Sequence, residues 1–314
     1  MEICILEKSS FCGDDLDVEA FCKLGTVRAY ERVPQERIAE TIGNAEAVLL
    51  NKSQITEEVL AACPKLRYVG AMGTGYNTID VEACRRRGIA VTNVPAYSTD
   101  AVAQLTFAFI LQFATSLMTY ANSVQDGDWQ RSPQFTYYPF PLSEISGKTL
   151  GIFGLGAIGK RVAAIGEAFG MKILYHARTK KDVPYEYVSV EELFARADYL
   201  TFHCPLNDSS REILNAKTLS LMKNTAFVIN TARGGLVKEA DLRAALDSGI
   251  IAGYAADTLA VEPQRADCPL IGAKNVFLTP HVAWAPRETR ARLIDIAVEN
   301  LAAFLAGKSQ NIVS

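Results

Sequence analysis

The sequence has no strong excess of charge of either sign. Its 314 residues include 32 lysines and arginines and 35 aspartates and glutamates, which gives a net charge of −3 at pH 7. A chain so close to neutrality has no global field that attracts nucleic acid or an anionic membrane, so we expect neither as a partner. Hydrophobic residues make up 49% of the chain, as in ordinary globular proteins, and its length suffices for two domains.

Paired cysteines and membrane-length apolar segments are also missing. The seven cysteines are scattered and never form a C-x-x-C motif, so we expect free thiols in the cytoplasm and no disulfide framework or metal site. The most apolar stretch, residues 101–118, is interrupted by two glutamines, two threonines and a serine, which favours a buried or interface helix. Met1 leads directly into the apolar residues 3–6 without a basic segment, so we expect no signal peptide.

Residues 148–179 show the order strand, glycine turn, helix, strand. The turn consists of Gly154, Leu155, Gly156, Ala157, Ile158 and Gly159. In such a unit the first glycine allows the tight turn, the second lets the backbone approach a pyrophosphate, and the third lets the helix pack on the sheet. The unpaired N–H groups at the helix start also favour a phosphate. The pattern predicts a dinucleotide site; the alternatives are a glycine turn of an unrelated α/β fold and a nucleoside-cofactor site such as that of a methyltransferase.

The end of the second strand lacks the acidic residue that would bind the ribose 2′-OH of NAD. The chain there reads Tyr175-His176-Ala177-Arg178-Thr179-Lys180-Lys181. Arg178 and Lys180 would attract the 2′-phosphate of NADP, and Thr179 would donate a hydroxyl group to it. We therefore favour NADP(H) as the cofactor; the alternative is a solvated basic turn in an enzyme that accepts NAD(H).

The first hundred residues alternate strand and helix patterns without a second glycine-rich motif. Strands are expected at residues 3–6, 27–30, 47–50, 67–71 and 90–92. This alternation predicts a parallel sheet with helices on both faces. The turn Gly73-Thr74-Gly75 follows the fourth of these strands, and its N–H groups could bind an anion, with a plain tight turn as an equal alternative.

A long helical pattern after Pro95 can cross from the first domain to the second, and another at residues 286–305 can return to the first. We expect residues 1–97 and 286–314 to form a substrate-binding domain and residues 98–285 to form a dinucleotide-binding domain. The expected fold class is α/β, with two doubly wound parallel-sheet domains, in which a Rossmann cofactor domain is inserted into a flavodoxin-like substrate domain.

Three polar residues follow strand patterns in the second half of the chain: Arg233, Glu262 and His281. An arginine can bind a substrate carboxylate and polarise a carbonyl group, and a histidine can donate the proton. A carboxylate beside the histidine favours its protonated form. The set suits hydride transfer from a nicotinamide to a 2-oxo acid, although three residues so far apart could also coincide by chance. The other histidines, His176 and His203, could simply fill space or turn the chain.

The sequence resembles the D-isomer-specific 2-hydroxyacid dehydrogenase family over essentially its whole length. The matching segments are residues 73–80, 102–104, 154–159, 203–206, 230–234 and 280–281. The resemblance implies that Arg233 binds the substrate carboxylate and carbonyl, that His281 is the acid/base, and that Glu262 supports it. It also implies that the N–H groups of Thr74 and Gly75 hold the substrate carboxylate.

The same resemblance extends the set of expected cofactor contacts. It places Asp257 near the nicotinamide carboxamide. The further expected contacts are His203, Cys204, Pro205, Thr231 and Ala232. The family is usually homodimeric, so the helix after Pro95 and the aromatic loop at residues 129–140 would form much of an interface, unless the aromatic side chains pack locally.

Within the family, the chain most resembles glycerate dehydrogenases, also called hydroxypyruvate or glyoxylate reductases. The segments that indicate this branch are residues 102–104, 140–142 and 281–284. The alternatives are a dehydrogenase of D-lactate type, of bulkier 2-oxo acids or of phosphoglycerate and, more remotely, a dinucleotide-sensing co-repressor. The acidic residue common in NAD-dependent members is absent, and so is the regulatory C-terminal extension of some phosphoglycerate dehydrogenases.

Overall fold

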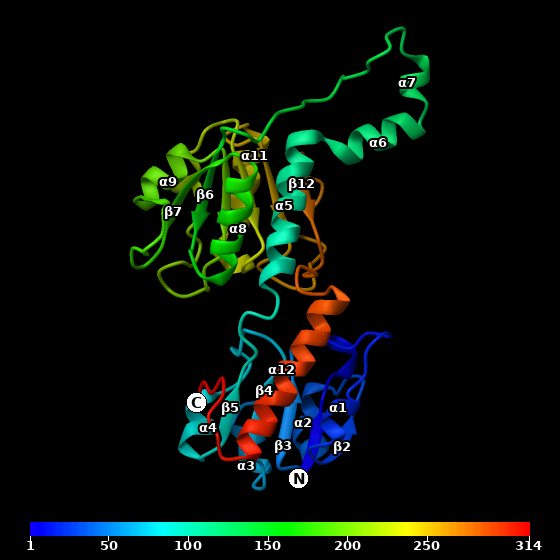
Figure 1. Cartoon of the computed structure of the whole chain (residues 1–314), viewed down its shortest axis with the longest axis vertical. Helices are drawn as coiled ribbons and strands as arrows, with labels where there is room; N and C mark the ends of the chain where they lie inside the picture. The colour runs from blue at the N-terminus through cyan, green and yellow to red at the C-terminus, as the bar shows by residue number, and fades with distance from the viewer. The chain divides into compact units, whose positions relative to one another are not determined.

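The computed structural model describes all 314 residues, which form two compact units (Figure 1). The first unit contains residues 1–98 and 284–314, and the second contains residues 99–283. The second unit is therefore an insertion in the chain of the first. Which unit binds the substrate and which binds the cofactor stays a prediction at this stage.

The first unit is built on a five-stranded, entirely parallel sheet with the order β2-β1-β3-β4-β5. Its strands are β1 (Glu2–Ile5), β2 (Thr26–Ala29), β3 (Ala47–Leu50), β4 (Tyr68–Ala71) and β5 (Ala90–Thr92). Its helices are α1 (Glu19–Cys22), α2 (Ile38–Ile42), α3 (Glu57–Ala62), α4 (Val81–Arg86) and α12 (Arg287–Leu305), with 3-10 turns η1 (Lys8–Ser10) and η2 (Gln35–Arg37). This strand order is that of a flavodoxin-like doubly wound sheet.

Side chains of β3 and β4 are buried throughout, because separate hydrophobic clusters cover the two faces of the sheet. At the carboxyl edge of this sheet, the buried Glu7 accepts hydrogen bonds from the N–H groups of Asn51, Lys52 and Ser53. Asn51 in turn donates to the carbonyl of Met72, 2.8 Å away, at the start of the predicted anion-binding turn. A buried carboxylate thus fixes the loops at this edge.

The second unit is built on a seven-stranded parallel sheet with the order β12-β11-β10-β9-β6-β7-β8. Its strands are β6 (Thr149–Phe153), β7 (Lys172–His176), β8 (Glu186–Tyr187), β9 (Tyr199–Phe202), β10 (Phe227–Asn230), β11 (Gly253–Ala256) and β12 (Val276–Leu278). The order reverses between β6 and β9, which is the switch point of a Rossmann fold. The expected fold class is confirmed.

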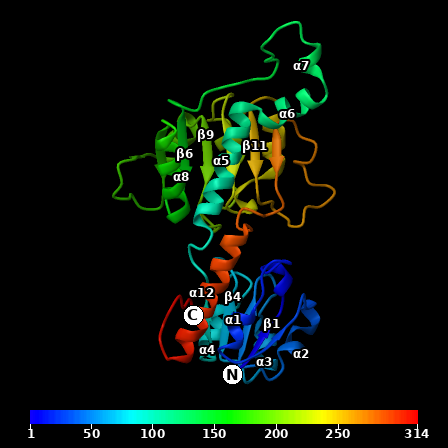
Figure 2. The same cartoon turned by 45° about the vertical axis from the view of Figure 1, so that its right-hand side comes forward.

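The helices of this unit cover both faces of the sheet, except for α6 and α7, which lie away from it (Figure 1). They are α5 (Thr99–Thr115), α6 (Leu117–Gln125), α7 (Asp128–Arg131), α8 (Ala157–Ala168), α9 (Val190–Arg196), α10 (Ala216–Leu219) and α11 (Glu239–Asp247), with the 3-10 turn η3 (Gly234–Leu236). Helix α5 packs beside α8 and against β10 (Figure 2). Alternate residues of β6 face opposite cores: Leu150 and Ile152 join the cluster under α5 and α8, whereas Phe153 joins the other.

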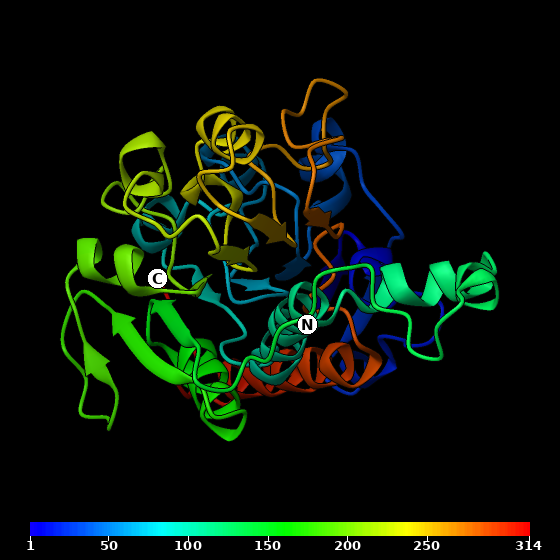
Figure 3. The same ribbon diagram turned by 90° about the horizontal axis from the view of Figure 1, so that it is seen from above.

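The expectation of one continuous helix over residues 101–118 was wrong at its C-terminal end. Helix α5 stops at Thr115, Ser116 takes a left-handed conformation with φ of 48°, and α6 continues at an angle of 60°. The apolar pattern continues across the break, but Leu117 and Met118 are exposed. Helices α6 and α7 with the following loop form an arm that extends away from the rest of the unit (Figure 3).

No single helix in the structure has both the length and the apolar composition needed to cross a membrane. The bent pair α5 and α6 meets these two criteria only when its members are taken together.

Candidate active site

The three glycines of the turn after β6 have three different surroundings. Gly154 has a φ of +103°, and a Cβ atom there would lie 2.7 Å from the carbonyl carbon of His203. A Cβ on Gly159 would lie 2.2 Å from the carbonyl oxygen of Gly154, so this glycine lets α8 pack against the turn. A Cβ on Gly156 would meet no atom within 4 Å. The turn therefore has one open position, at Gly156, where a ligand could approach the backbone.

Helix α8 begins immediately after this open position, and Gly156 at its N-cap supplies no side-chain cap. The N–H groups of Gly156, Ala157 and Ile158 have no acceptor in the structure. Unpaired N–H groups at the positive end of a helix suit the diphosphate of a dinucleotide. The residues present thus fit a bound dinucleotide at the predicted place.

His203 follows β9 and lies against the same turn, because its N–H donates to the carbonyl of Phe153 at 2.8 Å. Both ring nitrogens of His203 are buried and have no hydrogen-bond partner. Burial lowers the pKa of His203 from 6.5 to about 3, so the ring is neutral at physiological pH. A buried polar atom without a partner is costly, and a ligand that pairs with it would remove that cost.

The neighbouring Cys204 contrasts with a reactive cysteine. Burial raises the pKa of its thiol from 9.0 to about 11. The thiol therefore stays protonated near neutral pH and is a poor nucleophile. Any contribution of Cys204 to a cofactor site would be through packing.

The arginine of the basic turn after β7 has no partner within the structure and can bind a ligand. Arg178 is exposed and forms no hydrogen bond or ion pair in the structure. The Lys181 ammonium lies 3.2 Å from the hydroxyl oxygen of Thr179. His176 has a structural role, since its Nδ1–H donates to the carbonyl of Val188 at 2.9 Å and its ring stacks on Tyr187.

Arg233 lies in a turn that the preceding asparagine shapes. Asn230, at the buried end of β10, accepts a hydrogen bond from the Ala232 N–H at 3.0 Å and donates to the Arg233 carbonyl at 2.9 Å. The guanidinium of Arg233 is exposed and donates to the carbonyl of Ala232. Its other N–H groups have no partner in the structure and can bind a carboxylate. The hydroxyl of Thr231 pairs with that of Thr106 on α5 at 3.1 Å.

Glu262 and His281 form a hydrogen-bonded pair although they are 19 residues apart. The Nδ1–H of His281 donates to Oε2 of Glu262 at 2.7 Å. The other carboxylate oxygen, Oε1, accepts from the Leu259 N–H at 3.0 Å. The pair leaves Nε2 of His281 as the nitrogen that can exchange a proton with a substrate.

Asp257 holds the turn that carries His281. Its carboxylate is 1% exposed and accepts from the Thr279 hydroxyl at 2.6 Å and from the N–H groups of Val282 and Ala283 at 2.8 Å. These donors flank His281, which has an unusual φ of 57°. The resemblance had suggested a contact with the nicotinamide carboxamide, which stays a prediction. The contribution of Asp257 to the turn was not foreseen, and the only signal for it was an acid at a strand end.

The predicted anion-binding turn belongs to the first unit. The Gly73 carbonyl accepts from the Val94 N–H, the Thr74 carbonyl accepts from Asn93 Nδ2, and the Thr74 hydroxyl donates to the Val94 carbonyl. The N–H groups of Thr74 and Gly75 have no acceptor in the structure. The turn is thus held by its oxygens and leaves these donors available for an anion.

Comparison with known proteins agrees with this geometry. Residues 107–283 match the family model described as "D-isomer specific 2-hydroxyacid dehydrogenase, NAD binding domain". The chain belongs to this family. As a member, this dehydrogenase is an oxidoreductase that uses a nicotinamide dinucleotide.

Individual relatives cover almost the whole dehydrogenase. It is 38% identical to a hydroxypyruvate reductase of Blautia hydrogenotrophica over 100% of both chains. It is 41% identical to a glyoxylate reductase of Aeropyrum pernix, over 93% of this chain and 88% of the relative. Among solved structures, an NADPH-dependent glyoxylate/hydroxypyruvate reductase of Sinorhizobium meliloti, in complex with NADP and malonate, superposes with a TM-score of 0.85 at 29% identity, covering 100% of this chain and 96% of that one.

We predict that alanine at two glycines of the dehydrogenase affects two different properties, cofactor affinity and stability. Gly156→Ala should weaken dinucleotide binding about ten-fold or more and leave the fold intact, since its methyl group enters open space where the diphosphate would approach. Gly159→Ala should lower the free energy of unfolding by about 1–3 kcal/mol, since its methyl group overlaps a backbone oxygen. Fluorescence titration with NADPH and urea unfolding measure the two effects. Unchanged affinity in Gly156→Ala would contradict the diphosphate position.

Proposed function

We propose that the dehydrogenase reduces hydroxypyruvate or glyoxylate, giving D-glycerate or glycolate, and that NADPH is its preferred reductant. The pair of Glu262 and His281, with Nδ1 to carboxylate at 2.7 Å, carries this proposal because the hydrogen bond orients a proton donor. The names of the relatives support the substrate class, since they include hydroxypyruvate reductase, glyoxylate reductase and glycerate dehydrogenase.

In this mechanism the bound cofactor supplies the hydride. Arg233 binds the substrate carboxylate and polarises the carbonyl group, because its guanidinium has unpaired donors. Nε2 of His281 gives a proton to the carbonyl oxygen, and Glu262 holds the ring in place through its hydrogen bond with Nδ1. The N–H groups of Thr74 and Gly75 are proposed as further contacts of the carboxylate, since they have no acceptor in the structure.

The proposed cofactor contacts follow from the second unit. The turn residues 154–159 bind the diphosphate, with His203, Cys204 and Pro205 beside the turn and Thr231, Ala232 and Asp257 at the ends of the next strands. We assign the second unit, residues 99–283, to cofactor binding and the first unit to substrate binding. Arg178 and Thr179 bind the 2′-phosphate of NADP, and the unpaired guanidinium supports this assignment.

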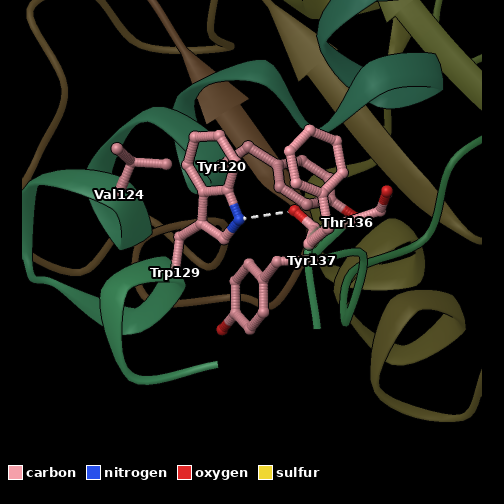
Figure 4. Close-up of a pocket in the computed structure, with 6 residues that line it drawn as sticks. Tyr120, Val124, Trp129, Thr136 and Tyr137 are labelled. Carbon is pink, nitrogen blue, oxygen red and sulfur yellow. Dashed lines mark hydrogen bonds between the residues drawn. The ribbon is translucent and has the colours of Figure 1, made fainter. Parts of the chain in front are cut away.

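We further propose that the dehydrogenase is a homodimer that uses the arm of α6, α7 and the following loop. Seven large apolar side chains of the arm are exposed: Leu117, Met118, Val124, Trp129, Phe135, Tyr138 and Leu142. Side chains of the arm line an apolar hollow of about 360 Å³, beside which the indole N–H of Trp129 donates to the Phe135 carbonyl at 2.9 Å (Figure 4). Exposed apolar surface of this density is typical of a protein interface.

Substitution of the proton donor or of the carboxylate-binding arginine should remove most activity. His281→Ala and Arg233→Ala should each lower kcat/KM for hydroxypyruvate and glyoxylate by about 10²–10⁴-fold, because each removes a group that acts on the reacting carbonyl. Initial rates of NADPH oxidation measure the loss. Arg37→Ala, an exposed arginine in a surface ion pair, is the control and should behave as wild type. Near-normal turnover by His281→Ala would refute the mechanism. If the wild-type enzyme prefers D-lactate-type or bulkier 2-oxo acids, the proposed substrate is wrong and the reaction type stands.

Removal of Arg178 should change the choice of cofactor without changing the reaction. Arg178→Ala should lower kcat/KM with NADPH by about 10–100-fold, the loss of one charge-assisted contact, and leave kcat/KM with NADH nearly unchanged. Lys172→Ala serves as the control, because Lys172 is an exposed lysine at the start of β7, the strand that precedes Arg178. Equal losses with both cofactors, or a wild-type preference for NADH, would leave Arg178 as a surface charge.

The dimer proposal predicts that the arm is needed for association. Phe135 is 92% exposed, so Phe135→Ser should cost the isolated chain little stability but weaken association measurably. Light scattering after size exclusion, over a series of concentrations, measures the mass. Leu221→Ser, which alters an exposed leucine outside the arm, should remain dimeric. A monomeric wild-type protein would contradict the proposal.

A further inference from the structure

The loop that carries Glu262 rests directly on the turn that carries Arg233. A Cβ atom on the buried Gly234 would lie 1.9 Å from the carbonyl carbon of Leu259 and 2.4 Å from the amide nitrogen of Ala260. Both are backbone atoms, which cannot swing aside as a side chain can. The peptide between Leu259 and Ala260 therefore occupies the space that any other residue at position 234 would need.

The same peptide is held from a second direction. The N–H of Ala260 donates to Oε1 of Glu239, the half-buried first residue of α11, at 2.8 Å. Directly before it, the N–H of Leu259 donates to Oε1 of Glu262. The chain of contacts thus runs from Glu239 to the Ala260 N–H, along the backbone of Leu259 to its own N–H, from there to Glu262, and from Glu262 to His281.

We propose that Glu239 is a positioning residue for the Glu262–His281 pair and acts through the Leu259–Ala260 peptide, with Gly234 allowing the close approach. The inference rests on the proposed function for the role of His281. The segment from Arg233 to Glu239 then has two roles. It carries the arginine, and it holds the loop of Glu262 in the position from which Glu262 binds His281. Proton transfer is sensitive to errors of about 1 Å in such an arrangement, so loss of this support lowers turnover more than binding.

Glu239 also has a plainly structural alternative, since an acidic residue in the first turn of α11 interacts favourably with the helix dipole. Glutamine separates the two roles. Glu239→Gln loses the charge but keeps an oxygen that accepts from the Ala260 N–H, whereas Glu239→Ala loses both. The positioning role predicts that glutamine rescues turnover, and the dipole role predicts that glutamine and alanine behave alike.

The kinetic test compares these variants in the full-length protein. Glu239→Ala should lower kcat about ten-fold or more, with the KM for hydroxypyruvate and the affinity for NADPH within about two-fold of wild type. Glu239→Gln should keep wild-type kcat. Glu191→Ala, which removes an exposed glutamate from the first turn of α9, controls for the helix dipole. A fall in kcat that is equal for Glu239→Gln and Glu239→Ala, or no fall in either, would overturn the proposal.

A second readout needs no turnover. The chain contains three histidines, so the ring signals of ¹³C-labelled histidine are few, and the His281→Gln variant identifies the one from His281. In Glu239→Ala this signal should move toward its position in Glu262→Ala, while in Glu239→Gln it should stay at the wild-type position. An unmoved signal in Glu239→Ala overturns the positioning role. If the wild-type protein turns over no 2-oxo acid but the His281 signal still shifts in Glu239→Ala, the proposed function is refuted and the positioning role stands.

Gly234 and its neighbour provide a matched pair. Gly234→Ala should displace the Leu259–Ala260 peptide and shift the His281 signal in the same direction as Glu239→Ala. Gly235→Ala is the control, because the atoms nearest to its Cβ would be those of the flexible Leu206 side chain, the closest a methyl carbon at 2.7 Å. An unshifted His281 signal in folded Gly234→Ala would contradict the close-approach argument. Failure of Gly234→Ala to fold would leave the two Glu239 variants as the deciding test.

Discussion

Close approach of one backbone segment to another sets the geometry of the candidate active site. Gly154 lies against the backbone of His203, Gly159 lies against the carbonyl of Gly154, and Gly234 lies against the Leu259–Ala260 peptide. In each case a Cβ atom would come within 3 Å of backbone atoms, which cannot rotate away. Two of these contacts, at Gly154 and Gly234, hold the turns that follow neighbouring strands against one another. The polar residues that follow those strands therefore occupy positions that the sheet determines.

Buried polar side chains complete the framework at the same edges. Asp257 pairs with donors on both sides of His281, Asn230 pairs with the turn of Arg233, and Glu7 pairs with three successive N–H groups of the first unit. Each satisfies backbone groups that a loop at a strand end would otherwise leave unpaired. Such loops can be rigid without secondary structure, and this rigidity lets the exposed Arg233 and the half-buried His281 keep a defined orientation.

Local patterns in the sequence were sufficient to predict the parallel sheets and the glycine turn. They indicated the three polar residues after strands only as a set that could coincide by chance, and the family resemblance was needed to assign roles to them. Periodicity and turn chemistry act over a few residues, so both can be read directly from the chain. The break at Ser116 was missed because the apolar pattern runs through it, and only the left-handed conformation of one residue ends α5. The contacts of Asp257 and Glu239 were also missed, because each joins segments about 20 or more residues apart, and no local spacing encodes them.

Cofactor choice and proton transfer, two parts of the proposed function, differ in how they depend on this framework. A 2′-phosphate contact at Arg178 needs only an unpaired charge at an exposed turn, so cofactor choice can change with one or two residues and without altering the fold. The proposed proton transfer by His281 would depend on Glu262, and through it on the backbone at Leu259, which lies against the turn of Gly234. Substitutions near the cofactor turn can therefore alter specificity at little structural cost, whereas substitutions between Arg233 and Glu239 affect the arginine and the histidine together. The reaction type is for this reason the more strongly constrained property of the molecule.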